Sequence, residues 1–302
     1  MDIQELFQAE NHIPSLPEIF YQVKSAIDDS SCSSYEIGKV VDNNPRLNAR
    51  ILKIVNSKFY DLPQAVESVS HALSLIDREQ LSDLILSIVV IDQFRSIPKT
   101  SLDMKSFWRH SIACGLSARY LALATGEVNS DRFFVTGLLH DIGCIVMSLK
   151  TPFKLLEVSL RNESKGETLH KAEFEVLGFN HADVGAYLMK TWKLPKAIEE
   201  SVGFHHNPAA ATEFSLEASI IHVAETITNT LDLGFQYAEK SNIPAIDEYA
   251  SEELLVPKDS LFLNIKKQVQ KEFDQVEQVF LEPVKHGNLE SLSSQNQLRV
   301  SA

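Results

Sequence analysis

The stretch Gly137-Leu138-Leu139-His140-Asp141-Ile142-Gly143 decides how the rest of this sequence is interpreted. Its adjacent histidine and aspartate can offer a metal ion one imidazole nitrogen and one carboxylate oxygen, and divalent first-row metals accept such mixed ligands. Apolar residues frame the pair, so we expect His140 and Asp141 to be buried at the start of a helix. Buried charged groups need a partner. A metal ion is one such partner, and a hydrogen-bonded pair that caps the helix is the alternative.

Five further side chains could complete a metal site with this pair. They are His110 upstream, His181 at a helix start, His205 and His206 at a helix end, and Glu225 on the helix that follows. We expect one of the two adjacent histidines to face the site and the other to face solvent. For the single histidines the alternative is burial with hydrogen bonds to backbone carbonyl groups. The alternative for Glu225 is a solvated helix position.

The other histidines receive a different prediction. His222 is expected to be a packing residue, although it lies three residues before Glu225. Cys144, directly after the central stretch, is expected to be a small buried residue, with a reactive thiol as the alternative. Four histidines have no partner by spacing and are expected to be structural or exposed: His12, His71, His170 and His286.

Apolar residues recur at helical spacing along the whole chain. Stripes with the i, i+3, i+4, i+7 pattern occur within residues 81–89, 112–120 and 216–227, and alternating strand patterns are absent. Asn180 is a plausible N-cap, Pro195 can begin the next helix, and Gly126 falls just past a helix end. These patterns predict an all-α protein.

Several longer motifs resemble one family. The motifs are Asn44-Pro45-Arg46-Leu47, Phe107-Trp108-Arg109-His110-Ser111, Trp192-Lys193-Leu194-Pro195 and His205-His206-Asn207-Pro208, together with residues 51–57, 68–73, 137–143 and 173–181. Together they identify residues 13 to about 282, roughly nine tenths of the chain, as similar to the HDOD domain, a branch of the HD superfamily. The resemblance implies an N-terminal helical subdomain beside an HD-like subdomain, and a role in bacterial regulation that is mostly non-catalytic.

The resemblance also implies a ligand set. Catalytic HD relatives bind metal through a histidine on one helix, the His-Asp pair and a later aspartate, and the HD-GYP phosphodiesterases of cyclic dinucleotides add further histidines. Carried over to this chain, the candidate ligands are His110, His140, Asp141, His181, His205 and His206, with Glu225 near the final aspartate. The chain departs from the HD-GYP pattern because Cys144 stands where those enzymes carry lysine and because their Gly-Tyr-Pro motif is absent.

The motifs divide the chain into five parts. We expect an N-terminal extension at 1–12, the N-terminal helical subdomain at 13–100 and the HD-like subdomain with the candidate metal site at 101–232. A linker and a C-terminal helix, starting near Asp259 or Ser260, are expected at 233–285, and a disordered tail at 286–302.

Composition limits the class of partner. The net charge of −13 argues against nucleic acid and against an anionic membrane surface, both of which require a basic face. No apolar run is expected to span a membrane, and three scattered cysteines indicate a reducing, cytoplasmic environment. We expect the partner to be another signalling protein or a small phosphorylated ligand, and oligomeric state stays open.

Three functions remain open at this point. The first is a regulatory module or scaffold on a degenerate HD framework. The second is a metal-dependent phosphohydrolase or phosphodiesterase with one or two metals, in which Arg109 could bind substrate phosphate. The third is an iron-based redox or gas sensor. The cofactor expected in each case is a divalent metal: Fe, Mn, Ni, Zn or Mg.

Overall fold

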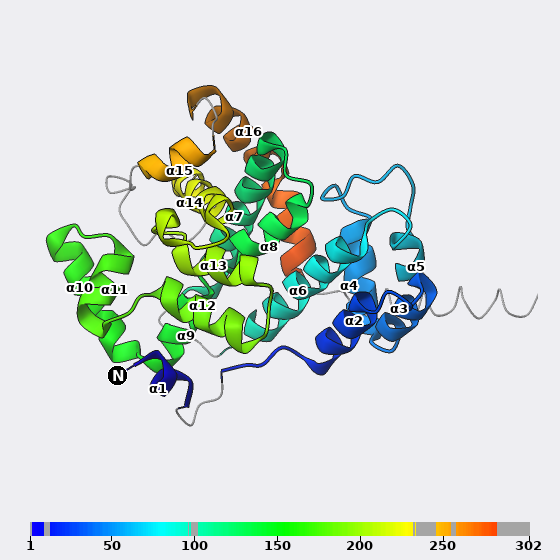
Figure 1. The fold of residues 1–302 in the computed structure, drawn as a ribbon, viewed down its shortest axis with the longest axis horizontal. Helices are drawn as coiled ribbons and strands as arrows, with labels where there is room; N and C mark the ends of the chain where they lie inside the picture. Colours follow the sequence, from blue (N-terminus) through cyan, green and yellow to red (C-terminus); the bar gives the residue numbers. More distant parts are fainter. Residues whose placement is uncertain are drawn as a thin grey trace, which may run out of the picture. The chain divides into compact units, whose positions relative to one another are not determined.

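The computed structural model describes residues 2–8, 13–95, 97, 102–231, 233, 246–254 and 258–282. All regular secondary structure within these ranges is helical, which confirms the predicted all-α class (Figure 1). The chain forms two compact units. Unit 1 is Met1–Ser15 with Gln93–Phe273, and unit 2 is Leu16–Asp92 with Asp274–Ala302. The predicted tail at 286–302, much of the predicted linker, His12 and His286 lie outside the described residues.

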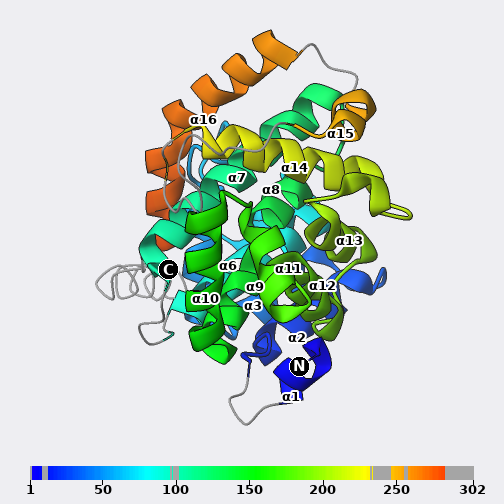
Figure 2. The same cartoon turned by 90° about the vertical axis from the view of Figure 1, so that its left-hand side faces the viewer.

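The candidate metal ligands all belong to unit 1. Its complete helices are α1 (Ile3–Gln8), α7 (Met104–Thr125), α8 (Ser130–Leu139), α9 (Ile142–Lys150), α10 (Pro152–Lys165), α11 (Leu169–Leu177), α12 (His181–Thr191), α13 (Lys196–Phe204), the 3-10 turn η1 (Pro208–Ala210), α14 (Ser215–Asn229) and α15 (Glu248–Glu253). Helix α7 packs along α8 and α14, and α9 packs on α12. Helices α10 and α11 lie side by side, as Figures 1 and 2 show.

Helices α8 and α9 are almost completely buried. Together they span Ser130–Lys150, which by length and composition is apolar enough to cross a membrane, with a mean hydropathy of 1.4. This finding corrects the expectation that no run of the chain is long and apolar enough. However, 89% of that stretch is buried inside the protein, as it is in the core helix of a globular fold. The apolar sequence therefore reflects the core of unit 1.

Local capping fixes the ends of the helices that carry the site. The Asn180 side chain accepts a hydrogen bond from the backbone N–H of Asp183 at 3.1 Å, and the Asp183 carboxylate accepts one from the backbone N–H of Asn180 at 2.9 Å. This capping box starts α12 and makes His181 its first residue. Gly126 ends α7 with φ of 86°, and Gly178 ends α11 with φ of 84°.

Gly143 allows two helices to approach closely. A Cβ atom at this position would lie 2.0 Å from the carbonyl oxygen of His181 and 2.9 Å from the backbone nitrogen of Gly185. Both neighbours are backbone atoms, which cannot rotate away. The absence of a side chain at Gly143 is therefore what lets the start of α9 contact the start of α12.

Unit 2 is a smaller helical bundle. It contains α2 (Glu18–Asp28), α3 (Ser34–Asp42), α4 (Pro45–Val55), α5 (Val69–Ala72), most of α6 (Arg78–Arg95) and the end of α16 (Lys258–Leu281). Arg50 is fully buried, and its guanidinium donates to Asp92 at 3.1 Å and to the carbonyl of Phe280 at 2.6 Å. The division between units falls at 92/93 and assigns Met1–Ser15 to unit 1, whereas the sequence suggested a boundary near residue 100 and a separate extension.

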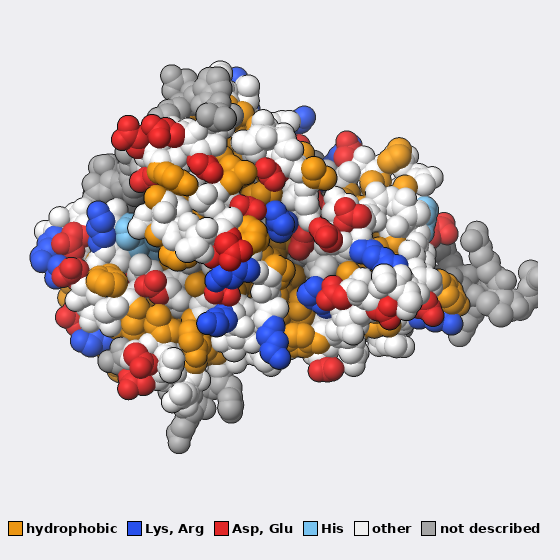
Figure 3. All heavy atoms as spheres, viewed as in Figure 1, with side chains coloured by type: hydrophobic (Ala, Val, Ile, Leu, Met, Phe, Trp, Pro, Cys, Tyr) orange, Lys and Arg blue, Asp and Glu red, His pale blue; other side chains and the backbone are white. Residues whose placement is uncertain are grey.

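The surface mixes charge with apolar side chains. On the face shown in Figure 3, acidic and basic groups neighbour one another over much of the area. Helix α10 exposes Phe153, Leu156 and Leu160 at helical spacing, and Phe174 of α11 is also exposed.

Candidate metal centre

Asp141 lies at the centre of the candidate site. It is the N-cap of α9, directly after the C-cap residue of α8, so the break between these two buried helices places both His140 and Asp141 inside unit 1. The two residues are 0% and 3% exposed. His110 from the middle of α7 and His181 from the start of α12 reach the same point. The site is thus built from helices distant in sequence.

The two carboxylate oxygens of Asp141 face different histidines. Oδ2 lies 3.2 Å from Nε2 of His140 and 3.8 Å from Nε2 of His110. Oδ1 lies 3.2 Å from Nε2 of His181 and 3.9 Å from Nε2 of His205. Each oxygen therefore has its own pair of imidazole nitrogens. This is the arrangement in which one carboxylate can bridge two cations.

The other ring nitrogen of three histidines is held by a hydrogen-bond acceptor. Nδ1 of His140 lies 2.8 Å from the carbonyl oxygen of Gly137, and Nδ1 of His205 lies 2.7 Å from that of Val202. Nδ1 of His181 lies 2.6 Å from the carboxylate of Glu173. An acceptor at Nδ1 fixes the proton there and turns the lone pair of Nε2 toward Asp141. Such outer partners are typical of metal-binding histidines.

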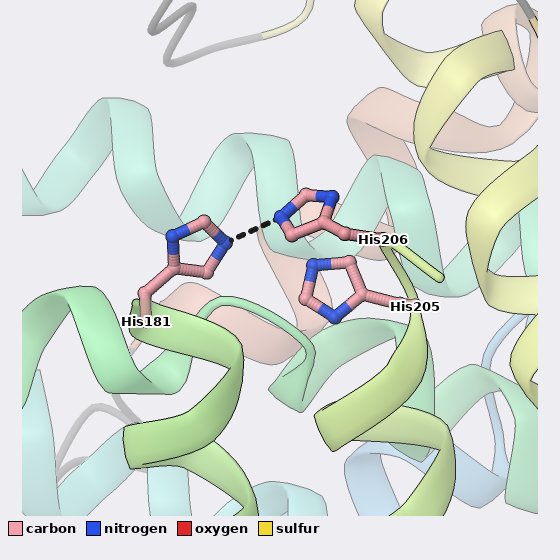
Figure 4. Close-up of side chains that lie close together, drawn as sticks. All are labelled: His181, His205 and His206. Atoms are coloured by element: carbon pink, nitrogen blue, oxygen red, sulfur yellow. Dashed lines mark hydrogen bonds between the residues drawn. The ribbon is translucent and has the colours of Figure 1, made fainter. Parts of the chain in front are cut away.

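His206 closes the cluster on the Oδ1 side. Its Nε2 lies 2.8 Å from Nε2 of His181, and Figure 4 shows the two rings meeting beside His205. Two imidazole lone pairs repel at this distance unless a proton or a cation lies between them. The expectation that one of His205 and His206 faces solvent is wrong, because both lie in the cluster, with side chains 0% and 14% exposed.

Electrostatics show that the cluster requires positive charge. Burial alone would raise the pKa of Asp141, but His140 and His181 hold that pKa well below its usual range. Burial would lower the pKa of His140, but Asp141 keeps it well above its ordinary value of 6.5. His110 has its pKa lowered to about 4, mainly by burial and then by His140. These shifts show that positive charge beside the buried carboxylate is favourable, and a divalent cation could supply it.

Glu225 lies farther from the centre. Its Oε2 is 3.7 Å from Nδ1 of His206 and 4.0 Å from Nε2 of His205. Burial, and then the charge of Asp141, raise its pKa to about 7. It thus lies within the cluster, as the sequence suggested, and ligation by it stays a prediction. The guanidinium of Arg109 lies over the ring of Phe273, 4.8 Å from its centroid, and its role in phosphate binding also stays a prediction.

His222 packs as expected. Its Nδ1 lies 2.8 Å from the carbonyl oxygen of His205, and its Nε2 accepts a hydrogen bond from the backbone N–H of Asp247 at 3.0 Å. Both ring nitrogens are occupied, so this histidine supports the backbone of His205 and leaves no nitrogen for a metal.

Two contributors on α11 were missed by sequence reasoning. Glu173 is 2% exposed and holds His181 through both its ring and its backbone N–H. His170, expected to have no partner, stacks on the ring of His206 with centroids 4.0 Å apart. The two lie three residues apart and so share one helix face. This three-residue spacing, in the stretch just before His181, is the sequence signal that could have identified both residues.

A pocket of about 580 Å³ leads from the surface to this cluster. His206 and His170 line it, and so do Lys171 and Phe174 of α11 and Asn180 at the start of α12. Its volume is within the range of small-molecule sites. Of the cluster histidines, His206 is therefore the one that a ligand in the pocket would meet first.

The residues fit a metal ion on two observations. First, within the described part of the chain, Nε2 of His140 and Nε2 of His205 are buried without a hydrogen-bond partner. Second, ligands about 2.0–2.1 Å from a tetrahedral ion lie about 3.3 Å from one another. The distances from Nε2 of His140 to Oδ2 of Asp141 and from Nε2 of His181 to Oδ1 of Asp141 are both 3.2 Å. The unpartnered nitrogens and their spacing both match a site able to hold a cation.

The Glu173→Gln substitution is expected to weaken metal binding by about 10- to 100-fold, the usual effect of losing an outer-shell carboxylate. Glutamine keeps the shape but removes the charge that orients His181. Competition with a chromogenic chelator measures the affinity. Glu200→Gln is the matched control, since Glu200 is also 2% exposed but binds the backbone of Thr212, Glu213 and Phe214. Equal affinities for both variants and the unsubstituted protein would contradict this assignment.

Comparisons with known proteins agree with this geometry. Residues 13–208 match the family described as HDOD domain. An uncharacterized protein of Treponema pallidum (strain Nichols) is 26% identical over 223 residues, which is 73% of this chain. The match spans 43% of that protein, so the chain corresponds to less than half of this relative.

Solved structures share the fold. A crystal structure of an HDOD domain protein of unknown function from Geobacter sulfurreducens has a TM-score of 0.73 at 21% identity, covering 93% of this chain and 97% of that one. A provisionally assigned phosphohydrolase from Shewanella amazonensis SB2B has a TM-score of 0.69 at 20% identity, with the same coverage. A provisionally assigned signal transduction protein from Marinobacter aquaeolei VT8 has a TM-score of 0.68 at 19% identity, covering 89% and 59%. From its sequence match and its fold, the chain belongs to the HDOD family.

Proposed function

We propose that this chain is a signal-transduction module whose HD-like unit binds one or two divalent first-row metal ions around Asp141. One observation carries the proposal: each oxygen of Asp141 faces a separate pair of histidine Nε2 atoms. His110 and His140 would hold one ion, and His181, His205 and His206 the other. The outer hydrogen bonds at Nδ1 support this reading, because a purely structural histidine gains nothing from an unpartnered Nε2.

Metal content by elemental analysis tests the proposal directly. The protein is purified without chelator or histidine tag, both under air and anaerobically, since ferrous iron is among the candidates. One or two equivalents of iron, manganese, nickel or zinc are expected. No metal after purification, and none taken up on addition, would overturn the proposal.

We further propose that a small phosphorylated ligand reaches the metal centre through the pocket beside His206. Lys171 supplies a cation at its wall, Phe174 an aromatic face, and Asn180 and Asn207 polar groups. The three carboxylates that line the pocket are engaged: Arg161 pairs with Glu167 at 2.8 Å and with Glu175 at 3.2 Å, and Asp183 accepts a hydrogen bond from the backbone N–H of Asn180 at 2.9 Å. Inorganic phosphate titrated into metal-loaded protein, with Lys171→Glu as the comparison, measures this binding. Equal affinity in both proteins would count against the pocket as the route.

Hydrolysis of a phosphoester at the same site is the second candidate. Each oxygen of Asp141 faces its own pair of histidines, so the site could hold two metal ions. Two-metal sites favour hydrolysis because they polarise phosphate and lower the pKa of a bound water. This chain's own residues would hold the ligand in the pocket, where His206 is the lining residue that belongs to the metal cluster. A screen of phosphomonoesters and cyclic dinucleotides with each metal tests this candidate. Turnover that is abolished by His140→Ala would support hydrolysis. No turnover with any metal would exclude hydrolysis and leave the proposed binding of a metal and a ligand.

Metal affinity is expected to rise with pH above the ordinary imidazole range. Burial lowers the pKa of His181, but Cys144, Glu173 and Asp141 outweigh that effect and raise it well above 6.5, as Asp141 does for His140. Protons on these rings compete with the metal. A raised pKa also stabilises the metal-free fold below pH 6.5, and this contribution is lost as pH rises.

The difference in Tm between metal-loaded and metal-free protein should therefore grow from about pH 6 to about pH 8.5. Thermal melts at constant metal activity measure it. A difference that is already constant above pH 6.5 would contradict the raised pKa values.

A further inference from the structure

Cys144 occupies a position from which it can reach the metal centre. It lies in the first turn of α9, and its backbone N–H donates to the carbonyl of Asp141 at 2.9 Å. Residues three apart on a helix share a face. The thiol therefore points the same way as the Asp141 carboxylate, and it is 3% exposed.

The thiol belongs to a compact set of ligand atoms. The sulfur of Cys144, a carboxylate oxygen of Asp141 and a ring nitrogen of His181 all lie within 4.8 Å of one another. Since Nδ1 of His181 is taken by Glu173, Nε2 is the nitrogen left for a cation. The contact between α9 and α12 at Gly143 holds these atoms together.

A second observation points to a cation on this side. Nε2 of His205 is fully buried, has no hydrogen-bond partner in the described structure and lies 3.9 Å from the same Oδ1 that contacts His181. Nε2 of His206 lies 2.8 Å from that of His181. Two candidate ligand clusters in the described residues therefore share His181: one with Asp141 and Cys144, the other with His205 and His206. The Oδ2 side has only nitrogen and oxygen ligands in its cluster of His110, His140 and Asp141.

We propose that Cys144 binds the metal ion on the Oδ1 side as a thiolate, which makes this half of the centre selective for zinc over manganese and magnesium. The inference rests on the metal-binding function proposed above. Thiolate and imidazole ligands suit Zn²⁺, whereas Mn²⁺ and Mg²⁺ suit carboxylate and water. On binding, the S–H bond breaks, its electron pair forms the bond to zinc, and the proton passes to buffer. No oxidant or reductant is required.

The Cys144 thiol is 3% exposed and so is shielded from solvent. A coordinating cation deprotonates a thiol outright.

X-ray absorption at the zinc edge tests the assignment on the intact, zinc-loaded chain. A sulfur neighbour at about 2.3 Å is expected, beside nitrogen and oxygen at about 2.0–2.1 Å. The sulfur signal should be lost in Cys144→Ser and retained in Cys114→Ser. Cys114 is the matched control because it is also buried but belongs to none of the candidate ligand clusters in the described residues. Zinc affinity relative to manganese should fall by at least about 10- to 100-fold in Cys144→Ser alone.

The outcomes separate the two proposals. Zinc bound with only nitrogen and oxygen neighbours, or a sulfur signal that survives Cys144→Ser, would overturn this inference and leave the metal centre in place. Failure to bind any metal would overturn both proposals. A spectrum of the unsubstituted protein without a sulfur neighbour overturns the inference whether or not a variant folds. Where Cys144→Ser fails to fold, Cys144→Ala provides a second variant.

Discussion

The Asp141→Asn variant is expected to purify without metal and to take up none at concentrations that saturate the unsubstituted protein. Asparagine has nearly the same shape but no charge, so this change removes the carboxylate that lies between the two histidine pairs. Loss of a direct ligand exceeds the roughly 10- to 100-fold effect of losing an outer-shell partner. Elemental analysis and titration with zinc or manganese measure the loss.

The control for this substitution is Asp131→Asn. Asp131 is also 3% exposed and lies on α8, but its carboxylate pairs with Arg119 at 3.1 Å. This variant should keep its metal even where stability falls. Retention of one full equivalent by Asp141→Asn would show that the histidines bind metal without the carboxylate, and the bridging role of Asp141 would be wrong.

The Gly143→Ala variant is expected to lose about 3 kcal/mol of unfolding free energy, at the upper end of the usual range for overpacking. The added Cβ would lie 2.0 Å from the carbonyl oxygen of His181, so α9 and α12 must move apart. In a domain of this size the loss corresponds to a fall in Tm of roughly 6–12 °C. The same shift would separate His181 from Asp141, so metal affinity should fall as well.

Gly203→Ala is the matched control for helix packing. A Cβ atom at Gly203 would meet only the Cβ of Ala186, at 3.0 Å, and the gain in helix propensity of about 1 kcal/mol offsets that contact. Thermal and denaturant unfolding of the two variants measure the difference. A Tm of Gly143→Ala equal to that of Gly203→Ala would mean that the close approach at Gly143 can relax at no cost.

The sequence predicted the fold, and it named the histidines and the aspartate that the structure brings together around Asp141. Helical periodicity, the N-cap at Asn180 and the glycine stop at Gly126 are local signals, and the structure places all three as expected. The central His-Asp pair and the histidines of other helices were identified by residue type and by family resemblance. These features are determined by short-range geometry or by recurrent motifs, which a sequence displays directly.

What the sequence did not reveal depends on tertiary packing. Glu173 reaches His181 only because α11 and α12 fold against each other, and His170 of α11 meets His206, which follows the end of α13. The burial of both His205 and His206 follows from how α13 ends beside α14. No spacing rule specifies such contacts. The sequence analysis did not identify Ser130–Lys150 as a long apolar stretch because the polar pair His140–Asp141 interrupts it near its centre.

The coincidence of the metal cluster with the break between α8 and α9 has an evolutionary consequence. The positions proposed to bind the ion also fill the middle of the bundle, so one substitution there is exposed to two kinds of selection at once. A lineage that abandoned the chemistry would still be constrained to keep well-fitting side chains at these places. Functional drift in such a protein should therefore begin at the rim, among pocket residues such as Lys171 and Phe174, and reach the innermost histidines last.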